Sequence, residues 1–370
     1  MPVKPHIVFT VINDLHYDQR MERICTSLSM AGYRVTLIGR QLETNKPLPQ
    51  RPYAQLRFKM PVNKGKLFYL LYNLRLLWHL LTHRYDIYGA TDLDTLVPHF
   101  IAASLKGKPF VYDAHEYFAE LPEVVNRPFV KWIWKKAEQF IVPRTRFAYT
   151  INQSYADLFE QQYGTRFAVI RNAALLRNEA IPNLKPERYI LYQGAVNVGR
   201  GVEQMIEAMQ FINDCKLYIC GKGDVYGKCT QLVQQLGLEN KVIFWGYIPP
   251  DELRHITLMA TLGFTFFTNE GQSYYYSLAN RFFDYFHAGV PQLCINFPEY
   301  ARINRQFEIA LLVNDLEPQT IAAAANRLLS DMPYYNRLRQ NCLAARQEIN
   351  WQNEEIKLLA FYKQVETQAL

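Results

Sequence analysis

Short apolar runs alternate with longer segments of helical periodicity along most of the chain. Runs rich in Val, Ile, Phe and Tyr predict β-strands. In the first half they lie at residues 6–11, 34–38, 86–89, 109–112 and 147–151. In the second half they lie at residues 189–193, 216–220, 242–245, 262–267 and 292–295. Helical patterns separate them, and this alternation predicts an α/β fold with parallel sheets and crossover helices.

The stretch NEAIPNLKPE at residues 178–187 interrupts this pattern. It holds two prolines and no periodicity, so we interpret it as a linker between two doubly wound halves. The predicted organisation is a first domain at 1–177, a linker at 178–188, a second domain at 189–349 and a terminal helix at 350–370. Ligands of such sheets bind at the carboxyl ends of the strands, so we expect a site in the cleft between the halves.

Length and composition agree with this organisation. A chain of 370 residues suits two domains rather than one small core. With 49% hydrophobic and 20% charged residues it is an ordinary globular protein, which excludes a disordered or fibrous one. Its 25 Tyr and 22 Phe could serve core packing, stacking on a ligand or contact with a membrane surface.

The most apolar helical stretch lies at residues 67–81. It is interrupted by polar side chains such as Arg75 and is shorter than the ~20 residues that span a bilayer, so we expect no crossing there. Its basic and aromatic character fits an amphipathic helix at a membrane interface, and a helix packed on its own sheet is the alternative. The side chains expected to meet anionic lipid are Lys64, Lys66, Lys131, Lys135 and Lys136.

Charge is divided unevenly between the halves. Residues 1–180 contain 24 Lys and Arg against 15 Asp and Glu, a balance of +9, whereas residues 181–370 contain 17 against 19, a balance of −2. A basic first half suits an anionic partner, and nucleic acid, lipid headgroups and a phosphorylated acceptor are each compatible with it. A solvated basic surface is the plain alternative.

The cysteines and the amino terminus bear on the compartment. The six cysteines have no CxxC pair and no Cys/His ligand spacing, which indicates a reducing compartment and no zinc site. The amino terminus enters a predicted strand almost at once, without the apolar region of a signal sequence. We therefore expect a cytoplasmic protein.

Two glycine-containing loops follow predicted strands of the second half. The first is YILYQGAVNVGRG at residues 189–201, in which glycines surround Arg200, and the second is LYICGKGD at residues 217–224, which contains Lys222. Backbone N–H groups in such loops, a helix start and a basic side chain can together bind phosphate. Glycine turns after strands are also common without a ligand.

The segment SLANRFFDYFHAGVP at residues 277–291 is the most specific in the chain. Ser277 or Asn280 is expected to cap a helix that ends before Gly289. Asp284, about one turn inside that helix, can accept hydrogen bonds from the hydroxyls of a ribose while the helix start faces phosphate.

These segments resemble a known family. YQGAVNVGRGVEQMIEAM, LYICGKGD, VIFWGYIPPDEL and SLANRFFDYFHAGVPQL follow one another in the order of the donor-binding domain of family 4 glycosyltransferases of the GT-B fold. In the first half, NDLHYDQRMERICTSLSMAGYRVTLIGR and PFVYDAHEYFAELP resemble segments of the capsule and lipopolysaccharide branch of that family. The resemblance covers essentially the whole chain.

The resemblance implies a fold and an activity. The fold is GT-B: two facing Rossmann-like, doubly wound domains, with a C-terminal helix that crosses back to the first. The activity is a retaining, metal-independent transfer of a hexosyl group. The donor is a nucleotide-diphosphate sugar, which is a substrate, so no cofactor is expected. The acceptor is a glycan, expected to be lipid-linked in surface polysaccharide synthesis, with a possible anionic membrane surface and no nucleic acid as partner.

The donor side is carried over residue by residue. Asp284 stands where the family has the second acidic residue of a Glu-x7-Glu motif, which binds the donor ribose. Tyr276 occupies the first acidic position, and Glu270 is the candidate to supply a carboxylate in its place. Arg200 matches the basic residue that grips the diphosphate, but Ala195 stands where a companion arginine is expected.

The remaining residues complete the predicted site. Lys222 or Arg281 can compensate for the missing arginine. His115 matches a histidine beside the transferred sugar, and a histidine that caps a turn is the alternative. The predicted catalytic set is His115, Arg200 and Lys222. The predicted donor-binding set is Gly194, Gly199, Gly221, Gly246, Glu270, Ser277, Asn280, Arg281 and Asp284.

The acceptor side is expected on loops of the first half. Arg20 is our candidate for an anion contact there. The predicted acceptor-side set is Asn13, Asp14, Asp18, Arg20, Asp92 and Glu116. Asp92 and Asp94 also resemble a metal-binding Asp-x-Asp pair, but we expect Thr91 or Asp92 to cap a helix at residues 93–104 and predict no metal site.

Two other functions stay open. One is a nucleotide-sugar 2-epimerase of the same fold, which would use the donor pocket without a second substrate. The other is a catalytically degenerate subunit that binds carbohydrate or a partner, which the residues Tyr276 and Ala195 favour.

Overall fold

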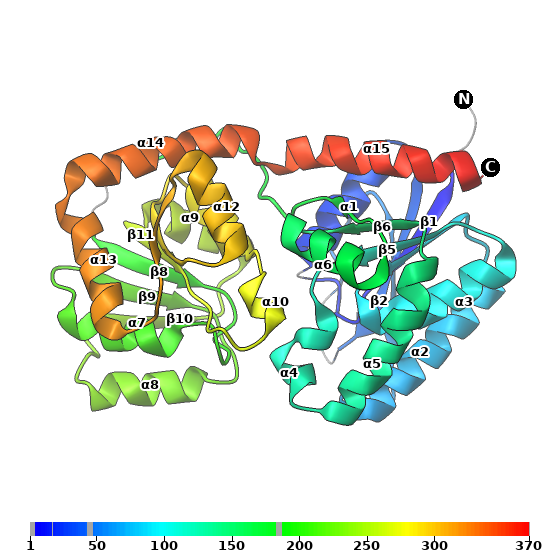
Figure 1. The fold of residues 1–370 in the computed structure, drawn as a ribbon, viewed down its shortest axis with the longest axis horizontal. Helices are drawn as coiled ribbons and strands as arrows, with labels where there is room; N and C mark the ends of the chain where they lie inside the picture. The colour runs from blue at the N-terminus through cyan, green and yellow to red at the C-terminus, as the bar shows by residue number, and fades with distance from the viewer. Residues whose placement is uncertain (1–3, 17, 43–46, 183–186, 370) are drawn as a thin grey trace. The chain divides into compact units, whose positions relative to one another are not determined.

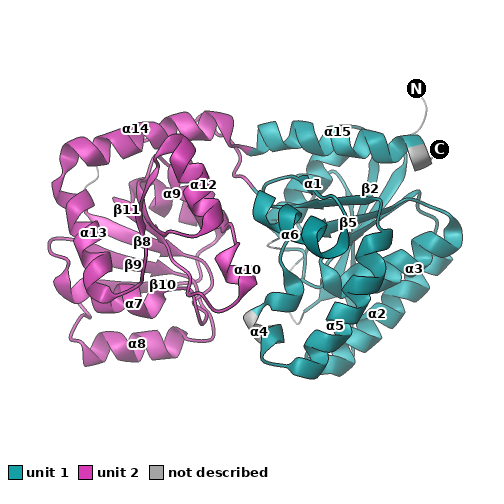
Figure 2. Ribbon diagram, viewed as in Figure 1, with its two compact units in different colours: residues 1–172, 351–370 teal, residues 173–350 magenta. Residues whose placement is uncertain are grey.

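The computed structural model describes residues 4–16, 18–42, 47–182 and 187–369 of the chain (Figure 1). The chain forms two compact units (Figure 2). Unit 1 consists of residues 1–172 with 351–370, and unit 2 of residues 173–350. The division thus falls after residue 172, where a boundary after 177 was predicted. Residues 183–186 of the predicted linker lie outside the described residues.

Unit 1 is built on a seven-stranded parallel sheet of order β3-β2-β1-β4-β5-β6-β7. Its core strands β1, β4, β5 and β6 are mostly apolar, as expected for strands that are covered on both faces. The strands are β1 (His6–Thr10), β2 (Arg34–Gln41), β3 (Ala54–Lys59), β4 (Ile87–Thr91), β5 (Phe110–Ala114), β6 (Phe147–Thr150) and β7 (Ala168–Val169).

Helices cover both faces of this sheet (Figure 1). Side chains alternate along a strand, so Ile7 and Phe9 pack against α1 and α15, whereas Val8 packs against α2 and α3. The helices are α1 (Gln19–Met30), α2 (Gly65–Thr82), α3 (Leu96–Lys106), α4 (Pro122–Val125), α5 (Pro128–Ile141), α6 (Gln153–Tyr163) and α15 (Trp351–Ala369), with short 3-10 turns η1 (Leu93–Thr95), η2 (Phe118–Glu120) and η3 (Val142–Arg144).

The terminal helix α15 belongs to unit 1, which confirms the prediction that the chain returns to its first half. Buried Trp351 donates from Nε1 to Ser27 Oγ on α1 at 3.0 Å. Farther along the helix, Tyr33 donates its hydroxyl to Glu366 Oε2 at 2.8 Å. Polar bonds at both ends and a buried apolar stripe between them therefore fix α15 along α1.

Unit 2 has a six-stranded parallel sheet of order β10-β9-β8-β11-β12-β13. The strands are β8 (Tyr189–Gln193), β9 (Lys216–Cys220), β10 (Val242–Gly246), β11 (Leu262–Thr265), β12 (Gln292–Ile295) and β13 (Ala310–Val313). The helices are α7 (Val202–Ala208), α8 (Tyr226–Gln235), α9 (Pro250–Met259), α10 (Gln272–Tyr275), α11 (Asn280–His287), α12 (Pro298–Phe307), α13 (Pro318–Ser330) and α14 (Met332–Glu348), with a 3-10 turn η4 (Met209–Phe211). Both sheets have the strand order of doubly wound folds, as predicted.

The structure differs from the prediction in a few elements. Strands β3, β7 and β13 were not predicted. The helix expected at residues 93–104 is instead the turn η1 followed by α3, which continues to Lys106. The apolar helix expected at 67–81 is α2, which begins earlier, at Gly65, and ends later, at Thr82. Across the described ranges, no helix combines the length and the apolar character needed to cross a bilayer.

Candidate functional site

Three loops at the carboxyl edge of the unit 2 sheet come together through their glycines. Gly194 N donates to Cys220 O at 3.0 Å, and Gly221 N donates to Gly246 O at 2.6 Å. A Cβ atom on Gly221 would lie 1.8 Å from Gly194 O, and φ of Gly221 is +155°. Only glycine fits such a position. The structure therefore brings the predicted residues Gly194, Gly221 and Gly246 together, and β8, β9 and β10 end side by side.

Two more glycines hold the loop that carries Arg200. Gly201, with φ of +69°, precedes α7, and a Cβ atom on it would lie 2.4 Å from Phe266 Cβ. A Cβ atom on Gly199 would lie 2.8 Å from Thr268 Oγ1. The loop is thus packed closely against the residues that follow β11, and this packing determines where Arg200 lies.

Arg200 and Arg281 lie against the same aromatic side chain. The Arg200 guanidinium is 5.3 Å from the ring centre of Phe267 and 5.5 Å from that of Tyr274. The Arg281 guanidinium is 4.7 Å from Phe267 and 4.9 Å from Tyr192. Cations over aromatic faces are attracted to the ring quadrupole, so both guanidinium groups are held close together.

Arg281 is almost completely buried, with 4% of its surface exposed. Its Nη2 donates to Phe266 O at 3.1 Å, and Nη1 would lie 3.6 Å from a Cβ atom on Gly194. Within the described ranges, no carboxylate forms an ion pair with this buried cation. An anion bound beside Gly194 would therefore find a cation that the protein does not neutralise. The compensation for Ala195 by Arg281 stays a prediction; the structure places the Arg281 guanidinium beside Gly194.

Asp284 on α11 is oriented by a hydrogen-bonded chain. Gln193 Nε2 donates to Asp284 Oδ2 at 2.8 Å, and Thr257 Oγ1 donates to Gln193 Oε1 at 2.7 Å. Because an ionised carboxylate only accepts, the Gln193 amide must present its nitrogen to Asp284 and its oxygen to Thr257. Both neighbours are buried, whereas Asp284 is partly exposed. This chain was not predicted; its one local signal is a glutamine at the end of an apolar strand.

The start of α11 corrects the capping prediction. The N-cap residue is Ala279, and no side chain caps the helix. Ser277 Oγ instead donates to Tyr274 O at 2.8 Å, and Tyr300 accepts a hydrogen bond from Ala279 N at 3.1 Å. A tyrosine distant in sequence thus holds the backbone that a local serine or asparagine was expected to hold. Asn280, the first residue of α11, is exposed.

The remaining donor-side residues lie at the periphery. Lys222 is exposed, and its Cε would lie 3.4 Å from a Cβ atom on Gly246, so it accompanies the glycine loops. Glu270 is exposed in the turn before α10, and Tyr276 follows α10 with its ring against Tyr275. A carboxylate role for Glu270 stays a prediction.

Unit 1 holds a charged network at the carboxyl edge of its sheet. Asp113, on β5, is completely buried. Its Oδ1 accepts from Arg20 Nη2 at 2.8 Å, and its Oδ2 lies 2.8 Å from His115 Nε2. Asp92 Oδ1 accepts from His115 N at 2.7 Å, while Asp92 Oδ2 lies 3.7 Å from His115 Nδ1. Asp113 was missed as a functional residue although it precedes His115 in the quoted segment.

The protonation of this network follows from its contacts. Burial lowers the pKa of His115, but the carboxylates of Asp113 and Asp92 outweigh it, so the pKa is raised. Burial opposes the charge of Asp113, but Arg20 and His115 outweigh it and lower the pKa of that carboxyl. Burial, with the neighbouring Asp113 charge, raises the pKa of Asp92. The imidazole is therefore favoured in its charged form between two acidic side chains.

Asp92 does not cap the helix that follows it, which corrects that prediction. No side chain caps η1. The Asp92 carboxylate accepts from the backbone of His115 and Glu116 instead, and its φ of +56° is unusual for a residue other than glycine. This strained backbone directs the carboxylate to the loop after β5. Asp92 and His115 are thereby brought together, with Glu116 exposed beside them.

The other predicted acceptor-side residues bond to neighbours within unit 1, and their acceptor role stays a prediction. Asp18 caps α1 by accepting from Met21 N at 2.9 Å, and it accepts from Asn13 Nδ2 at 2.6 Å. Asp14 pairs with Arg57 at 2.6 Å. The guanidinium of Arg20 is internal, since its Nη1 donates to Ile170 O at 3.0 Å. An anion contact by Arg20 stays a prediction that this geometry does not favour.

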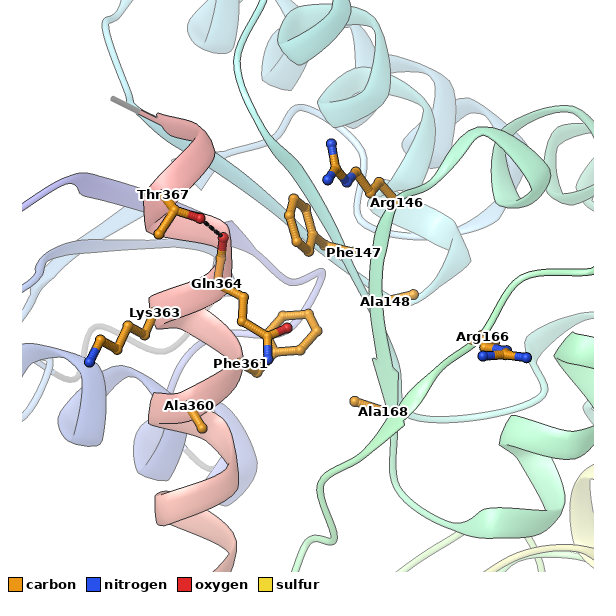
Figure 3. Close-up of a pocket in the computed structure, with 10 residues that line it drawn as sticks. All are labelled: Arg146, Phe147, Ala148, Arg166, Ala168, Ala360, Phe361, Lys363, Gln364 and Thr367. Atoms are coloured by element: carbon orange, nitrogen blue, oxygen red, sulfur yellow. Dashed lines mark hydrogen bonds between the residues drawn. The ribbon is translucent and has the colours of Figure 1, made fainter.

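A hollow of about 730 Å³ opens elsewhere in unit 1 (Figure 3). It lies between α15 and the beginning of β6, where Phe147 and Phe361 face one another with ring centres 6.2 Å apart. This is the amino-terminal end of the strand, opposite to the edge that carries His115. Ligands of open α/β sheets bind at the carboxyl ends, so this hollow is separate from the candidate site. In the described part of the chain, no three potential metal ligands gather.

Two family models match the chain. The model described as Glycosyltransferase Family 4 matches residues 19–174, and the model described as Glycosyl transferases group 1 matches residues 177–344. Between them they cover most of both units.

Similar proteins share the fold. A sucrose-phosphate synthase from Thermosynechococcus elongatus is 17% identical, with a TM-score of 0.81 over 98% of this chain and 99% of that chain. Alr3699/HepE from Anabaena, solved with UDP and glucose, is 16% identical, with a TM-score of 0.73 over 97% of this chain and 99% of that chain. An uncharacterised glycosyltransferase of Methanocaldococcus jannaschii is 25% identical over 181 residues, 48% of this chain and only 45% of that relative. The chain belongs to the family 4 glycosyltransferases of the GT-B fold.

Proposed function

We propose that the protein is a retaining glycosyltransferase that moves a hexosyl group from a nucleotide-diphosphate sugar to a glycan. The observation that carries the proposal is the pair of guanidinium groups, Arg200 and Arg281, gathered over Phe267 beside the glycine loops of unit 2. Guanidinium forks and backbone N–H groups suit a diphosphate. The UDP and UDP-glucose in structures of Anabaena HepE, which has the same fold, support this class of donor.

The main chemical task in this proposal is to stabilise the departing diphosphate. Arg200, Arg281 and Lys222 supply positive charge where negative charge develops. The acceptor hydroxyl attacks on the face from which the diphosphate leaves, and the departing phosphate takes its proton. With three cationic side chains assigned to the diphosphate, we propose a reaction independent of a divalent cation.

Asp284 is assigned to the donor ribose. A carboxylate accepts hydrogen bonds from two vicinal hydroxyls, and the Gln193 amide orients it. His115 is assigned to the transferred sugar. Its ring is fixed through Nε2 by Asp113, while Nδ1 lies near Asp92 but beyond hydrogen-bond distance, so its N–H can be offered to a sugar oxygen.

The acceptor in this proposal is a glycan carried on a lipid, in surface polysaccharide synthesis. The basic balance of the first half suits a phosphate-bearing lipid carrier. Asp92 and Glu116, at the exposed side of the His115 network, are the proposed acceptor contacts. We place the enzyme in the cytoplasm, working at the inner face of a membrane.

A degenerate binding subunit is the second candidate, because Tyr276 stands where the family has a carboxylate. The buried cation Arg281 argues against it, because no carboxylate of the described residues pairs with this guanidinium and a bound diphosphate would supply the missing negative charge. A nucleotide-sugar 2-epimerase would use the same donor residues and is separated from a transferase only by its product.

The test is incubation with UDP-, GDP-, ADP- and dTDP-sugars, with mass detection of released nucleotide and of any isomerised sugar. We expect nucleotide release from one donor class, lost in Asp284→Ala and kept in Glu239→Ala, which removes an exposed carboxylate of unit 2. Isomerised donor without release would support the epimerase. No change of any donor, together with no binding of any nucleotide, would support the degenerate subunit.

A further inference from the structure

Helix α2 exposes an apolar stripe that the fold does not use. Its buried stripe, Phe68, Tyr72, Leu76 and Leu80, packs on the sheet of unit 1. On the opposite side of the helix, Trp78 is 71% exposed and its neighbours along the stripe are exposed as well. The members of this outer stripe are Leu67, Leu70, Leu74, Trp78 and Leu81. A surface helix normally carries polar side chains on the side that faces solvent, whereas α2 carries apolar ones there.

Helix α5 repeats this arrangement. Phe129 is 61% exposed, and Trp132, Ile133 and Phe140 recur with it at helical spacing on the outer side. The two helices are neighbours, since the rings of Tyr69 and Trp134 are 6.1 Å apart and Lys66 Nζ lies 5.2 Å from the ring of Phe129. Figure 1 shows α2, α3 and α5 grouped on one side of unit 1. We call the exposed apolar side chains of α2 and α5 the outer face.

The exposed charged side chains of α2 and α5, the helices that carry the outer face, are basic. Helices α2 and α3 contain no Asp or Glu, and the one acid of α5, Glu138, is buried and accepts from Tyr163 at 2.6 Å. Of the five lysines predicted to meet lipid, Lys131 and Lys135 pair with Glu120. The other three, Lys64, Lys66 and Lys136, are exposed and form no ion pair within the described ranges.

Exposed apolar patches of this extent mark an interaction surface. Two occupants fit an apolar face, a lipid surface or another protein. Protein interfaces are depleted in lysine, whereas the surface of an anionic bilayer attracts it, and tryptophan favours the bilayer interface. Trp78 and Trp132 occur together with exposed lysines on helices that present no exposed acid of their own, and this combination favours lipid.

We propose that the outer face docks unit 1 on an anionic phospholipid surface, with α2 and α5 lying in the plane of the headgroups. The side chains of Leu74, Trp78 and Trp132 enter the boundary of the acyl chains, and Lys64, Lys66 and Lys136 contact lipid phosphates. The inference rests on the proposed function in one respect: a lipid-linked acceptor would be found at that surface.

The test is co-sedimentation with vesicles of phosphatidylcholine alone and of phosphatidylcholine with phosphatidylglycerol in equal parts. Binding is expected for the mixed vesicles and should weaken as salt rises. Leu74→Ser with Trp78→Ser, and separately Trp132→Ser, should each lower the partition coefficient at least about tenfold, because they remove large apolar side chains from the bilayer. Each of Lys64→Gln, Lys66→Gln and Lys136→Gln should lower it roughly fivefold at low salt.

Matched controls are Met30→Ser and Ile356→Ser, which remove exposed apolar side chains of unit 1 outside the outer face and should leave the partition unchanged. Equal losses in controls and test variants, or no binding of wild type to mixed vesicles at low salt, would overturn the proposal. A wild-type dimer in the absence of lipid that Trp78→Ser makes monomeric would overturn it in favour of a second copy of the chain.

Donor binding measured without vesicles separates this inference from the proposed function. The outer-face variants are expected to bind nucleotide as wild type does, since they change residues of unit 1 whereas the proposed donor residues belong to unit 2. Wild type that binds vesicles but no nucleotide would contradict the proposed function and leave the docking surface standing. The reverse result would contradict only the docking surface.

Discussion

Replacing Gln193 by leucine is expected to weaken nucleotide binding without unfolding unit 2. The wild-type amide donates to Asp284 Oδ2 at 2.8 Å and accepts from Thr257 Oγ1 at 2.7 Å. Leucine keeps much of the buried volume and removes both bonds. Thr257 keeps Leu253 O as an acceptor at 2.8 Å, so its hydroxyl stays satisfied. The consequence falls on the Asp284 carboxylate, which loses the group that orients it.

The size of the effect follows from the type of bond. A hydrogen bond to a charged group contributes about 1.5–3 kcal/mol. Asp284 is partly exposed, so water replaces part of this contribution in the variant. We therefore expect the loss to be near the lower limit, about 1.4 kcal/mol, which is a tenfold rise in Kd for a nucleoside diphosphate.

Isothermal titration calorimetry with the nucleoside diphosphate of the preferred donor measures this change. The tenfold loss should apply to the ribonucleotide and be absent for its dideoxyribose analogue, which lacks the hydroxyls that Asp284 is proposed to bind. Thr257→Val, which leaves the Gln193–Asp284 bond in place, should have a smaller effect. If Gln193→Leu lowers the affinity of both nucleotides equally, or of neither, Gln193 does not act through the contact of Asp284 with the ribose.

Three further predictions concern stability in urea. Burial lowers the pKa of His115, but the effect of its two carboxylate neighbours is larger, so the net pKa is raised. The free energy of unfolding that His115 adds relative to His115→Gln should therefore be present below pH ~6.5 and be lost as pH rises through the raised folded-state pKa. A pH-independent difference between the two proteins would contradict this. Gly221→Ala should lower the free energy of unfolding by about 3 kcal/mol, because the added Cβ atom would lie against the carbonyl oxygen of Gly194. Gly227→Ala is the control: its Cβ atom has open space on α8, so this change should stabilise the protein. Similar effects of the two changes would argue against the close packing of the glycine loops. Trp351→Ala should lower the free energy of unfolding by about 3–5 kcal/mol, because it empties a buried site, and Ser27→Ala by about 1 kcal/mol, because it removes one hydrogen bond. A small effect of Trp351→Ala would mean that α15 does not stabilise unit 1.

The strands that the sequence predicted best are those buried on both faces. Strands β8 and β12, which are buried at every residue, begin and end where the pattern indicates, because a parallel core strand is a largely apolar run. Strand β3 was missed since it lies at the edge of its sheet and alternates apolar and polar residues, of which only Phe58 is buried. Strand β7 has two residues, too few for any pattern.

The residues of the candidate site also fall into two groups: some are indicated by a local sequence pattern, and others depend on partners that are distant in the sequence. Glycine loops and a helix with an internal acid are local patterns, so the positions of Gly194, Gly221 and Asp284 could be predicted. The partners of Arg20 and Asp92 lie on other strands, and no spacing along the chain indicates them. For this reason Arg20 was expected as a surface cation and Asp92 as a helix cap, whereas both belong to the network around His115.

Arg200 and Arg281 are proposed to form the diphosphate site of unit 2. Calorimetric titration of wild type and Arg200→Gln with nucleoside diphosphates and with the corresponding nucleosides tests it most directly. We expect saturable binding of one nucleoside diphosphate, much weaker binding of its nucleoside, and a loss of affinity of at least about tenfold in the variant, as for a charge-assisted contact to phosphate. Equal affinity of wild type and variant, or no binding of any nucleoside diphosphate to wild type, would contradict it.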